Sequence, residues 1–382
     1  MNAEFTVDRR SLSSALARLV KTAGSKKHRK QQLATAQVNV NGNVSIGTTN
    51  LESSQTIVLD ADDFRGSAIV RINIHDFAKV VRAQKSKSLI VSCSDDGIEV
   101  GTAALASPYP DSECPSTRTA EFKVDATWAG KSEELVGYVT KTSYATDEET
   151  FRYALGGVLF EIKNHSSITL VATDGRRLAM ASDCISTAVD EFDSEQGAHG
   201  IAPAAFMTAL TKALAKTETV KIELGTERIR ATTFDKHGEA LSHLESRLLE
   251  GRFPSWRKVI DRKEIANVAM VDANELLESM EQCKSIDNPV ERGIEFTLEN
   301  GLLRFEYKTP TGKVARSINA PPWNSAIPYK FTALLNYLYL RDIAKSSKDL
   351  VVEISGDSLA KKNSRPVYFD GRGFTAIVMP MD

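Results

Sequence analysis

Three segments of the chain combine a strand-like sequence ending in Val-Asp with apolar residues at helical spacing. The strand-like sequences are Phe5–Asp8, Phe122–Asp125 and Ala269–Asp272. Apolar positions recurring near every 3.6 residues are typical of an amphipathic helix. The Asp suits a helix N-cap, because its carboxylate accepts an orphan backbone N–H. We therefore expect a helix after each sequence, with apolar positions at Leu12, Leu16, Leu19 and Val20; at Leu135, Val136 and Val139; and at Leu276, Leu277 and Met280.

A second helix is predicted in each segment, over Ile74–Val81, Ile201–Leu214 and Phe331–Leu338. Between the helices, short runs alternate apolar and polar residues, which favours β-strands. Asn41-Gly42 and Asn300-Gly301 fit tight hairpin turns, since both residue types tolerate positive φ. The pattern predicts an α+β fold of three repeated domains, each with two helices packed on antiparallel sheets. The predicted domains are residues 1–118, 119–254 and 255–382.

The composition is that of a globular protein without a membrane span. The chain has 382 residues, 42% hydrophobic and 26% charged, and no apolar run approaches the ~18 residues that a span requires. The first residues are polar and acidic, and the four cysteines are scattered, so we expect no secretory signal and a reducing cytoplasm. The net charge is only −2, so a nucleic-acid surface would require the two signs to lie on different faces.

Basic residues concentrate on most of the predicted helices, whereas many acidic residues fall on strands and turns. The exception is the first helix of the third segment, with Glu275, Glu278 and Glu281. Ordinary solvated helix faces and loops also give such patterns, and that alternative stays open. A shared basic surface would suit sequence-independent phosphate contact. The basic positions that we expect on it are Lys26, Lys27, Arg29, Lys30, Lys79, Arg82, Lys141, Lys212, Lys216, Arg341 and Lys345.

No catalytic, metal-binding or cofactor-binding motif stands out. The stretch Asp125–Ser132 has the Gly-Lys-Ser of a phosphate-binding loop, but Asp125 occupies the position that requires glycine. A nucleotide-binding enzyme is therefore the weaker alternative. The six histidines lack metal-ligand spacing. We expect no enzyme activity, no cofactor and no metal.

Four segments together resemble one known family. They are Tyr153–Glu161, Leu170–Met180, Glu250–Val259 and Ala376–Met381. In this order and at these distances they are similar to the bacterial-type sliding clamp, the beta subunit of DNA polymerase III. The resemblance implies a head-to-tail homodimeric ring, with helices around a hole for duplex DNA and sheets outside. It implies a processivity factor for DNA replication, whose partners are a DNA polymerase, a clamp loader and repair factors. A clamp-derived interaction module that does not close a ring is an alternative.

The resemblance also implies a pocket that captures short linear peptides. Arg176 stands where the family commonly has His, and Lys258 where Arg is common, which changes the expected peptide preference. The resemblance implies a subunit interface near Ala103–Ala106 and Ser285–Ile286, where the sequence has no strong apolar anchor. The implied pocket residues are Leu155, Thr173, Gly175, Arg176, Arg177, Leu178, Pro254, Lys258, Val259, Val378, Met379, Pro380 and Met381.

Overall fold

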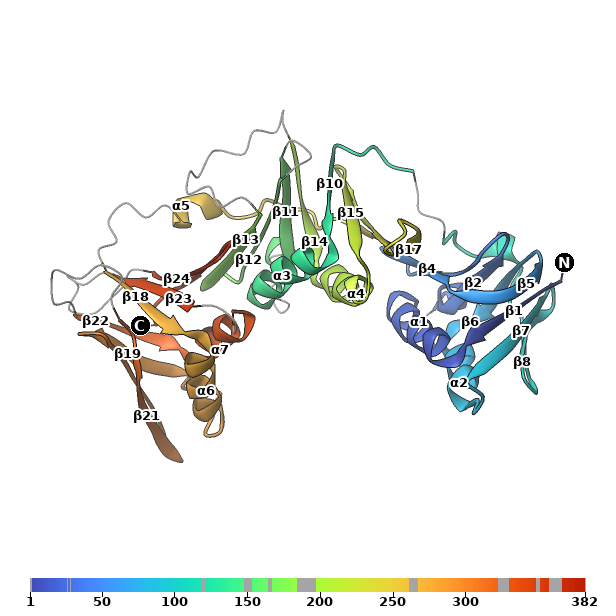
Figure 1. Ribbon diagram of the computed structural model, residues 1–382. Helices are drawn as coiled ribbons and strands as arrows, with labels where there is room; N and C mark the ends of the chain where they lie inside the picture. Colours follow the sequence, from blue (N-terminus) through green and yellow to red (C-terminus); the bar gives the residue numbers. More distant parts are fainter. Residues whose placement is uncertain are drawn as a thin grey trace. The chain divides into compact units, whose positions relative to one another are not determined.

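The computed structural model describes residues 2–25, 27, 29–117, 121–147, 153–163, 167–183, 197–260, 267–321, 330–347, 351–356 and 366–381. Helices and antiparallel strands alternate along the chain (Figure 1). The first third contains β1 Ala3–Asp8, α1 Arg9–Thr22, β2 Thr35–Val40, β3 Val44–Thr49, β4 Ser53–Leu59, β5 Ala61–Gly66, β6 Ala68–Asn73, α2 Ile74–Ala83, β7 Ser88–Ser94, β8 Gly97–Val100 and β9 Ala103–Ala106.

The middle third contains β10 Ala126–Lys131, α3 Ser132–Thr142, β11 Gly157–Lys163, β12 Ser167–Thr173, β13 Arg177–Ser182, β14 Gly197–Pro203, α4 Ala204–Leu214, β15 Thr219–Leu224, β16 Arg228–Phe234 and β17 Ala240–Arg247. The last third contains α5 Trp256–Ile260, β18 Asn267–Asp272, α6 Ala273–Lys284, β19 Gly293–Glu299, β20 Leu302–Thr309, β21 Gly312–Asn319, β22 Lys330–Asn336, α7 Tyr337–Ser346, β23 Val351–Gly356, β24 Val367–Gly371 and β25 Phe374–Val378.

The three-fold repeat is visible in the element order. Apart from the additional short helix α5 that precedes β18, each third has in its described residues one strand and a helix, then several strands and a second helix, and then three strands. The strand before the first helix pairs with the strand after the second helix in every third, as β1 with β7, β10 with β15 and β18 with β23. The prediction of an α+β fold with two helices per repeat is therefore confirmed. The domain limits at 118 and 254 stay a prediction.

Some predicted element limits are wrong. Asp8 and Asp272 cap α1 and α6 through backbone N–H groups, but Asp125 precedes a strand, β10, and α3 begins only at Ser132. Ile201 lies in β14, not in a helix. The segment from Phe331 to Leu335 lies in β22, and from Thr332 to Leu335 the burial alternates with period two rather than 3.6.

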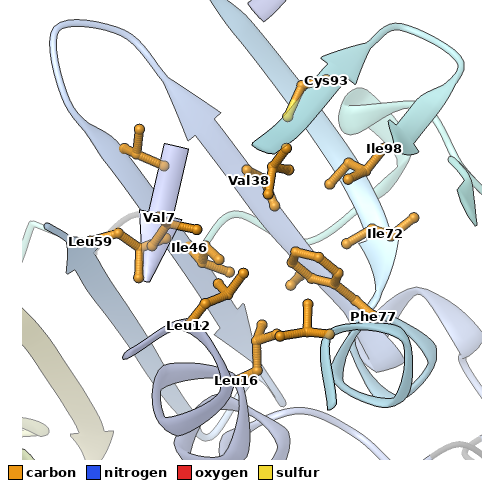
Figure 2. Close-up of a cluster of buried hydrophobic side chains, with 14 of the residues drawn as sticks. Val7, Leu12, Leu16, Val38, Ile46, Leu59, Ile72, Phe77, Cys93 and Ile98 are labelled. Atoms are coloured by element: carbon orange, nitrogen blue, oxygen red, sulfur yellow. The ribbon is translucent and has the colours of Figure 1, made fainter. Parts of the chain in front are cut away.

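The chain forms two compact units whose division passes through the middle third. The first unit comprises Met1–Val136, Ile162–Ser166 and Gln196–Leu249. Its larger sheet has the order β10-β15-β16-β17-β4-β3-β2-β6, and its smaller sheet β5-β1-β7-β8-β9. Phe77, Leu12 and Leu16 from the helices meet Val38, Ile46 and Ile98 from the strands in its core (Figure 2). The apolar stripes predicted for α1 and α2 therefore face the sheets.

The second unit comprises Gly137–Glu161, Ser167–Glu195 and Glu250–Asp382. Its strands run in the order β11-β12-β13-β25-β24-β23-β18, and a separate sheet has the order β21-β20-β19-β22. Phe296 of β19 and Phe369 of β24 stack edge to face with ring centroids 6.4 Å apart, which joins the two sheets in one core. The β13–β25 pairing places the sequence around residue 175 beside the C-terminal residues.

Two hairpin turns follow the sequence prediction. Gly42 has φ 71°, and Asn300 and Gly301 have φ 48° and 78°. At Asn300-Gly301 both central residues have the positive φ that Asn-Gly was expected to supply, whereas at Asn41-Gly42 only the glycine has it.

Candidate functional site

The turn between β12 and β13 is built by its own polar side chains. The Asp174 carboxylate accepts the backbone N–H groups of Arg176 and Arg177, both at 2.8 Å. The Thr173 hydroxyl donates to the Arg177 carbonyl at 2.6 Å and accepts from the Gly175 N–H at 3.1 Å. Gly175 has φ 84°, a conformation that favours glycine. The sequence Thr-Asp-Gly therefore fixes the turn locally and leaves Gly175 and Arg176 exposed.

Arg177 is held inside the second unit and is not a free cation. Its Nε donates to Asp174 at 3.0 Å, its Nη1 to Asp342 of α7 at 2.7 Å, and its Nη2 to the Tyr144 carbonyl at 2.5 Å. The guanidinium also lies 4.4 Å from the ring centroid of Tyr339. Each of the three guanidinium nitrogen atoms therefore has a hydrogen-bond partner within the unit. Arg177 therefore fastens the turn to α7, and Arg176 is the neighbouring cation that can meet a ligand.

The C-terminal residues pair with this turn. β25 runs antiparallel to β13, with Arg177 opposite Val378 and Leu178 opposite Ile377. Beyond the strand, the Met379 N–H donates to the Arg176 carbonyl at 2.9 Å. The apolar C-terminal residues therefore pair with the second unit through backbone hydrogen bonds. Met379 remains 38% exposed, which makes it available to a ligand.

The helix α5 is fastened over the same sheet by a buried carboxylate. Glu161 of β11, only 6% exposed, accepts two bonds from Arg257, at 3.0 and 2.5 Å, and one from the Trp256 indole N–H at 3.3 Å. The Arg257 guanidinium also stacks over the Trp256 ring, 4.1 Å from its centroid. These contacts fix the first turn of α5.

A second contact fixes the other end of α5. The Tyr368 hydroxyl of β24 donates to the Val259 carbonyl at 3.0 Å. Val259 is 39% exposed, and Lys258 is also exposed. A helix of five residues is not stable alone, so these anchors determine where the two side chains point.

The strand register separates the predicted pocket residues into two faces. Thr173, Leu178, Ile377 and Tyr368 lie directly opposite one another on four adjacent strands. Directly opposed residues of antiparallel strands share a face. Tyr368 on this face donates to the Val259 carbonyl of α5, so α5 covers this face. Arg177 and Val378 belong to the next row and point to the other side.

We call the residues of the α5 side the peptide surface. They comprise Thr173, Gly175, Arg176, Leu178, Pro254, Lys258, Val259 and Met379. Leu155 is buried in the short 3-10 helix Tyr153–Leu155. The Met381 N–H donates to the Leu334 carbonyl at 2.8 Å, and Pro380 precedes it. The sequence analysis missed Glu161, Tyr368 and Ile377. An acid inside the apolar run Val158–Ile162 was the available signal for Glu161.

The predicted basic residues of the first unit lie on helices and one loop. Lys79 forms an exposed ion pair with Asp76 at 3.7 Å, and Arg82 and Lys216 are exposed. Lys27, Arg29 and Lys30 are exposed in a loop that the Gly24 N–H closes by donating to the Leu33 carbonyl at 2.7 Å. Lys26 lies outside the described residues. Lys212 of α4 lies beside Lys21 of α1, which the prediction had not included.

In the second unit, only part of the predicted basic set is free to meet an anion. Lys345 is exposed. Arg341 donates to Glu281 at 2.7 Å, so its charge is already compensated. The Lys141 ammonium donates to the Arg372 carbonyl at 3.1 Å, and burial lowers the pKa of Lys141.

Catalytic chemistry finds no support in the described residues. Asp125–Ser132 is mostly the strand β10 and not a loop. No group of three His, Cys, Asp or Glu side chains could hold a metal ion within the described ranges. Burial raises the pKa of Cys93 to about 12 and that of Cys283 to about 11, so neither thiol is a ready nucleophile. No helix in the part of the chain that the structure describes is long and apolar enough to cross a membrane.

Comparisons with known proteins agree with this geometry. A family model described as "DNA polymerase III beta subunit, central domain" matches residues 131–255. The chain is similar to the Beta sliding clamp of Pseudomonas aeruginosa, with 33% identity over 173 residues, covering 45% of this chain and 44% of that protein. It is similar to the Beta sliding clamp of Vibrio cholerae, with 26% identity over 328 residues, covering 82% and 83%. The match spans about half the length of several curated relatives, as with the 52% of the one from Pseudomonas putida.

Solved structures share the fold over the full chain. A DnaN sliding clamp from Pseudomonas aeruginosa bound to griselimycin has a TM-score of 0.82 and 21% identity, covering 100% of both chains. The DNA polymerase III beta subunit from Thermotoga maritima has a TM-score of 0.78 and 21% identity, covering 100% of this chain and 99% of that one.

Proposed function

Because this chain belongs to the family of DNA polymerase III beta subunits, the sliding clamps, we propose that it closes a ring around duplex DNA and tethers a polymerase there. It acts without catalysis or a cofactor. Its homodimer serves DNA replication in the cytoplasm, and the repeated domains are residues 1–118, 119–254 and 255–382. Its peptide surface receives linear motifs of the polymerase, the clamp loader and repair factors.

Two edge strands that lack a second pairing partner among the described residues support the ring proposal. The last strand of the middle third, β17, pairs with β4 of the first third. The last strand of the last third, β25, pairs with β13 of the middle third. By the repeat, the corresponding strands are β9 and β21, and among the described residues each lies at the edge of its sheet without such a partner. A second copy that pairs its β9 with β21 of the first, and the reverse, uses both edges and closes a two-fold ring.

Charge complementarity supports the same arrangement. At the β4–β17 join, α1 packs on α4. The equivalent helices at the β21–β9 join are α6 of one copy and α2 of the other. The helix α6 has Glu275, Glu278 and Glu281, whereas α2 has Lys79 and Arg82. Within the chain, Glu278 pairs with Arg316 and Glu281 with Arg341, and both glutamate side chains stay part-exposed. The acidic helix that departs from the basic trend thus faces a basic partner.

Enclosure allows the protein to stay on DNA while individual phosphate contacts remain weak. Tight contacts would stop sliding, and each neutralised phosphate makes affinity fall with salt. The exposed basic side chains of the first unit suit such contacts. No base-reading helix is required.

The apolar and basic side chains of the peptide surface favour a short partner segment with apolar anchors. Val259 and Met379 are exposed large apolar residues, and Met adapts its shape to varied partners. Arg176 and Lys258 lie at the same surface and suit an acidic group or a carbonyl.

A topological assay tests the proposal. The protein is loaded on nicked circular DNA by a clamp loader, and the DNA is then linearised. We expect retention on the circle at high salt and loss from the linear form, because a ring slides off a free end. A protein that is monomeric at micromolar concentration and is never retained on the circle would instead be an interaction module. Replacing Lys27, Arg29 and Lys30 by Ala is expected to flatten the salt dependence by about 0.9 per contact, for all DNA sequences alike.

A further inference from the structure

The segment that follows the edge strand β9 is a strap over the larger sheet of the first unit. We use the name strap for residues 107–117. The Ser107 N–H donates to the Asp96 carbonyl at 2.7 Å, directly after β9 ends, and a 3-10 helix follows at Asp111–Glu113. Most side chains of the strap are exposed. Its position therefore depends on polar contacts with the sheet rather than on a core of its own.

A buried guanidinium of the sheet binds the strap. Arg71 of β6 is only 2% exposed. Its Nε donates to the Asp111 Oδ1 at 2.6 Å, and its Nη2 donates to the Pro115 carbonyl at 3.0 Å. A buried cation requires such partners, and here both acceptors belong to the strap. We call the pair of Arg71 and Asp111 the latch.

The amide of Gln37 in β2 connects the two ends of the strap. Its Nε2 donates to the Asp111 Oδ1 at 2.7 Å, and its Oε1 accepts from the Thr117 hydroxyl at 2.7 Å. The Thr56 hydroxyl of β4 donates to the Thr117 carbonyl at 3.3 Å. The strap is therefore held at both ends by side chains of the sheet.

The strand register places these anchors in one row across four adjacent strands. Gln37 lies opposite Arg71 on one side and Gly47 of β3 on the other, and Gly47 lies opposite Thr56. Opposed residues of antiparallel strands share a face. A Cβ at Gly47 would lie 2.8 Å from the Thr117 Cβ, so the glycine leaves the room that the strap occupies. The row is thus a built seat for the strap.

We propose that the latch holds β9 in the position from which this strand pairs with a second copy of the chain. Ala103–Ala106 is a strand of four residues that pairs with β8 alone among the described residues, and alternate residues of it are exposed. A strand with so few contacts opens readily. The latch, five residues beyond its end, fixes the direction in which the chain leaves it. Arg71 and Asp111 are therefore positioning residues that act through β9.

This inference rests on the proposed function, because it takes β9 as the strand that meets β21 of the second copy. The latch itself lies within the first unit and does not depend on a ring. The Asp111 side chain is 43% exposed, so water can replace its contacts when they are lost. Removing this carboxylate is expected to free the strap and leave the apolar core in place.

The test compares Asp111→Ala with Glu113→Ala in the full-length protein. Glu113 is the matched control, since it is an exposed carboxylate of the same 3-10 helix. Hydrogen exchange is measured on protein diluted below its dimer dissociation constant, and that constant is measured by analytical ultracentrifugation. We expect faster exchange at Ala103–Ala106 and weaker dimers for Asp111→Ala alone. If β9 keeps its pairing position in about a third of the molecules, the dimer dissociation constant rises about ninefold, because each of two copies contributes one β9.

A second variant keeps the test decisive if Asp111→Ala does not fold. Adding Arg71→Met removes the buried cation as well, and losing both members of a buried pair costs less than losing one. The same rise in exchange and in the dimer dissociation constant is expected. Faster exchange at β9 without weaker dimers, or neither change, would overturn the inference. A wild type that never dimerises would refute the ring, and the exchange at β9 would still decide whether the latch holds this strand.

Discussion

Replacing Glu161 tests whether the peptide surface depends on the anchoring of α5. The Glu161 carboxylate receives three bonds from Trp256 and Arg257. Removing one member of a buried charge pair costs about 3–5 kcal/mol. Because the Arg257 side chain is 22% exposed, we expect the low end of that range for Glu161→Ala. This loss applies to the free energy of unfolding and to the position of α5.

Only part of this loss of free energy is expected to appear as weaker peptide binding. The Tyr368 hydroxyl still holds the Val259 carbonyl. If α5 then occupies its bound position in roughly one molecule in ten, the apparent Kd rises about tenfold, or about 1.4 kcal/mol. Glu161→Gln retains acceptor capacity and is expected to cause a smaller rise. Tyr368→Phe removes one neutral bond and should weaken binding by about 0.5–1.5 kcal/mol.

Fluorescence anisotropy with a labelled polymerase-derived peptide measures these changes. The matched control is Glu52→Gln, whose side chain is 70% exposed and lies 4.0 Å from Arg247. Such a surface pair contributes little, so the control should bind like wild type. A folded, dimeric Glu161→Ala protein with a Kd within twofold of wild type would refute the reasoning.

Three further changes test other contacts. Met379→Ala should weaken the same peptide by about 1–3 kcal/mol, and a titration that matches wild type would remove Met379 from the surface. Arg177→Lys keeps the charge but loses the planar fork, so urea unfolding should show a loss of about 2–3 kcal/mol, whereas unchanged stability would contradict the anchoring role. Glu278→Lys should raise the dimer dissociation constant in analytical ultracentrifugation, and adding Arg82→Glu should partly restore it. Independent effects of the two changes would argue against their proximity across the interface.

The repeated helices could be predicted because their signals are local. Apolar spacing and an N-capping Asp identified α1 and α6. The same logic failed at Asp125, because the next six residues pair with β15 and continue as a strand. It also failed at Phe331–Leu335, since an apolar run without clear spacing fits a buried strand as well as a helix.

The peptide surface could be predicted only in part. The turn at Thr173–Arg177 is visible in sequence because its hydrogen bonds are local. Its division into two faces depends on pairing with β25, some 200 residues away along the chain. The anchors Glu161 and Tyr368 also act over long sequence separations. No local pattern reports such contacts, so family resemblance placed Arg177 and Val378 among ligand-facing residues although they point to the other side.

The strand pairings β4–β17 and β13–β25 affect how much the sequence can change while this architecture is kept. Ladder hydrogen bonds use backbone N–H and C=O groups, which every residue except proline supplies. Side chains along such a join can be exchanged while the strands stay paired. An architecture whose parts are connected in this way can keep its shape after most residues have changed, as the 21% identity at a TM-score of 0.82 illustrates.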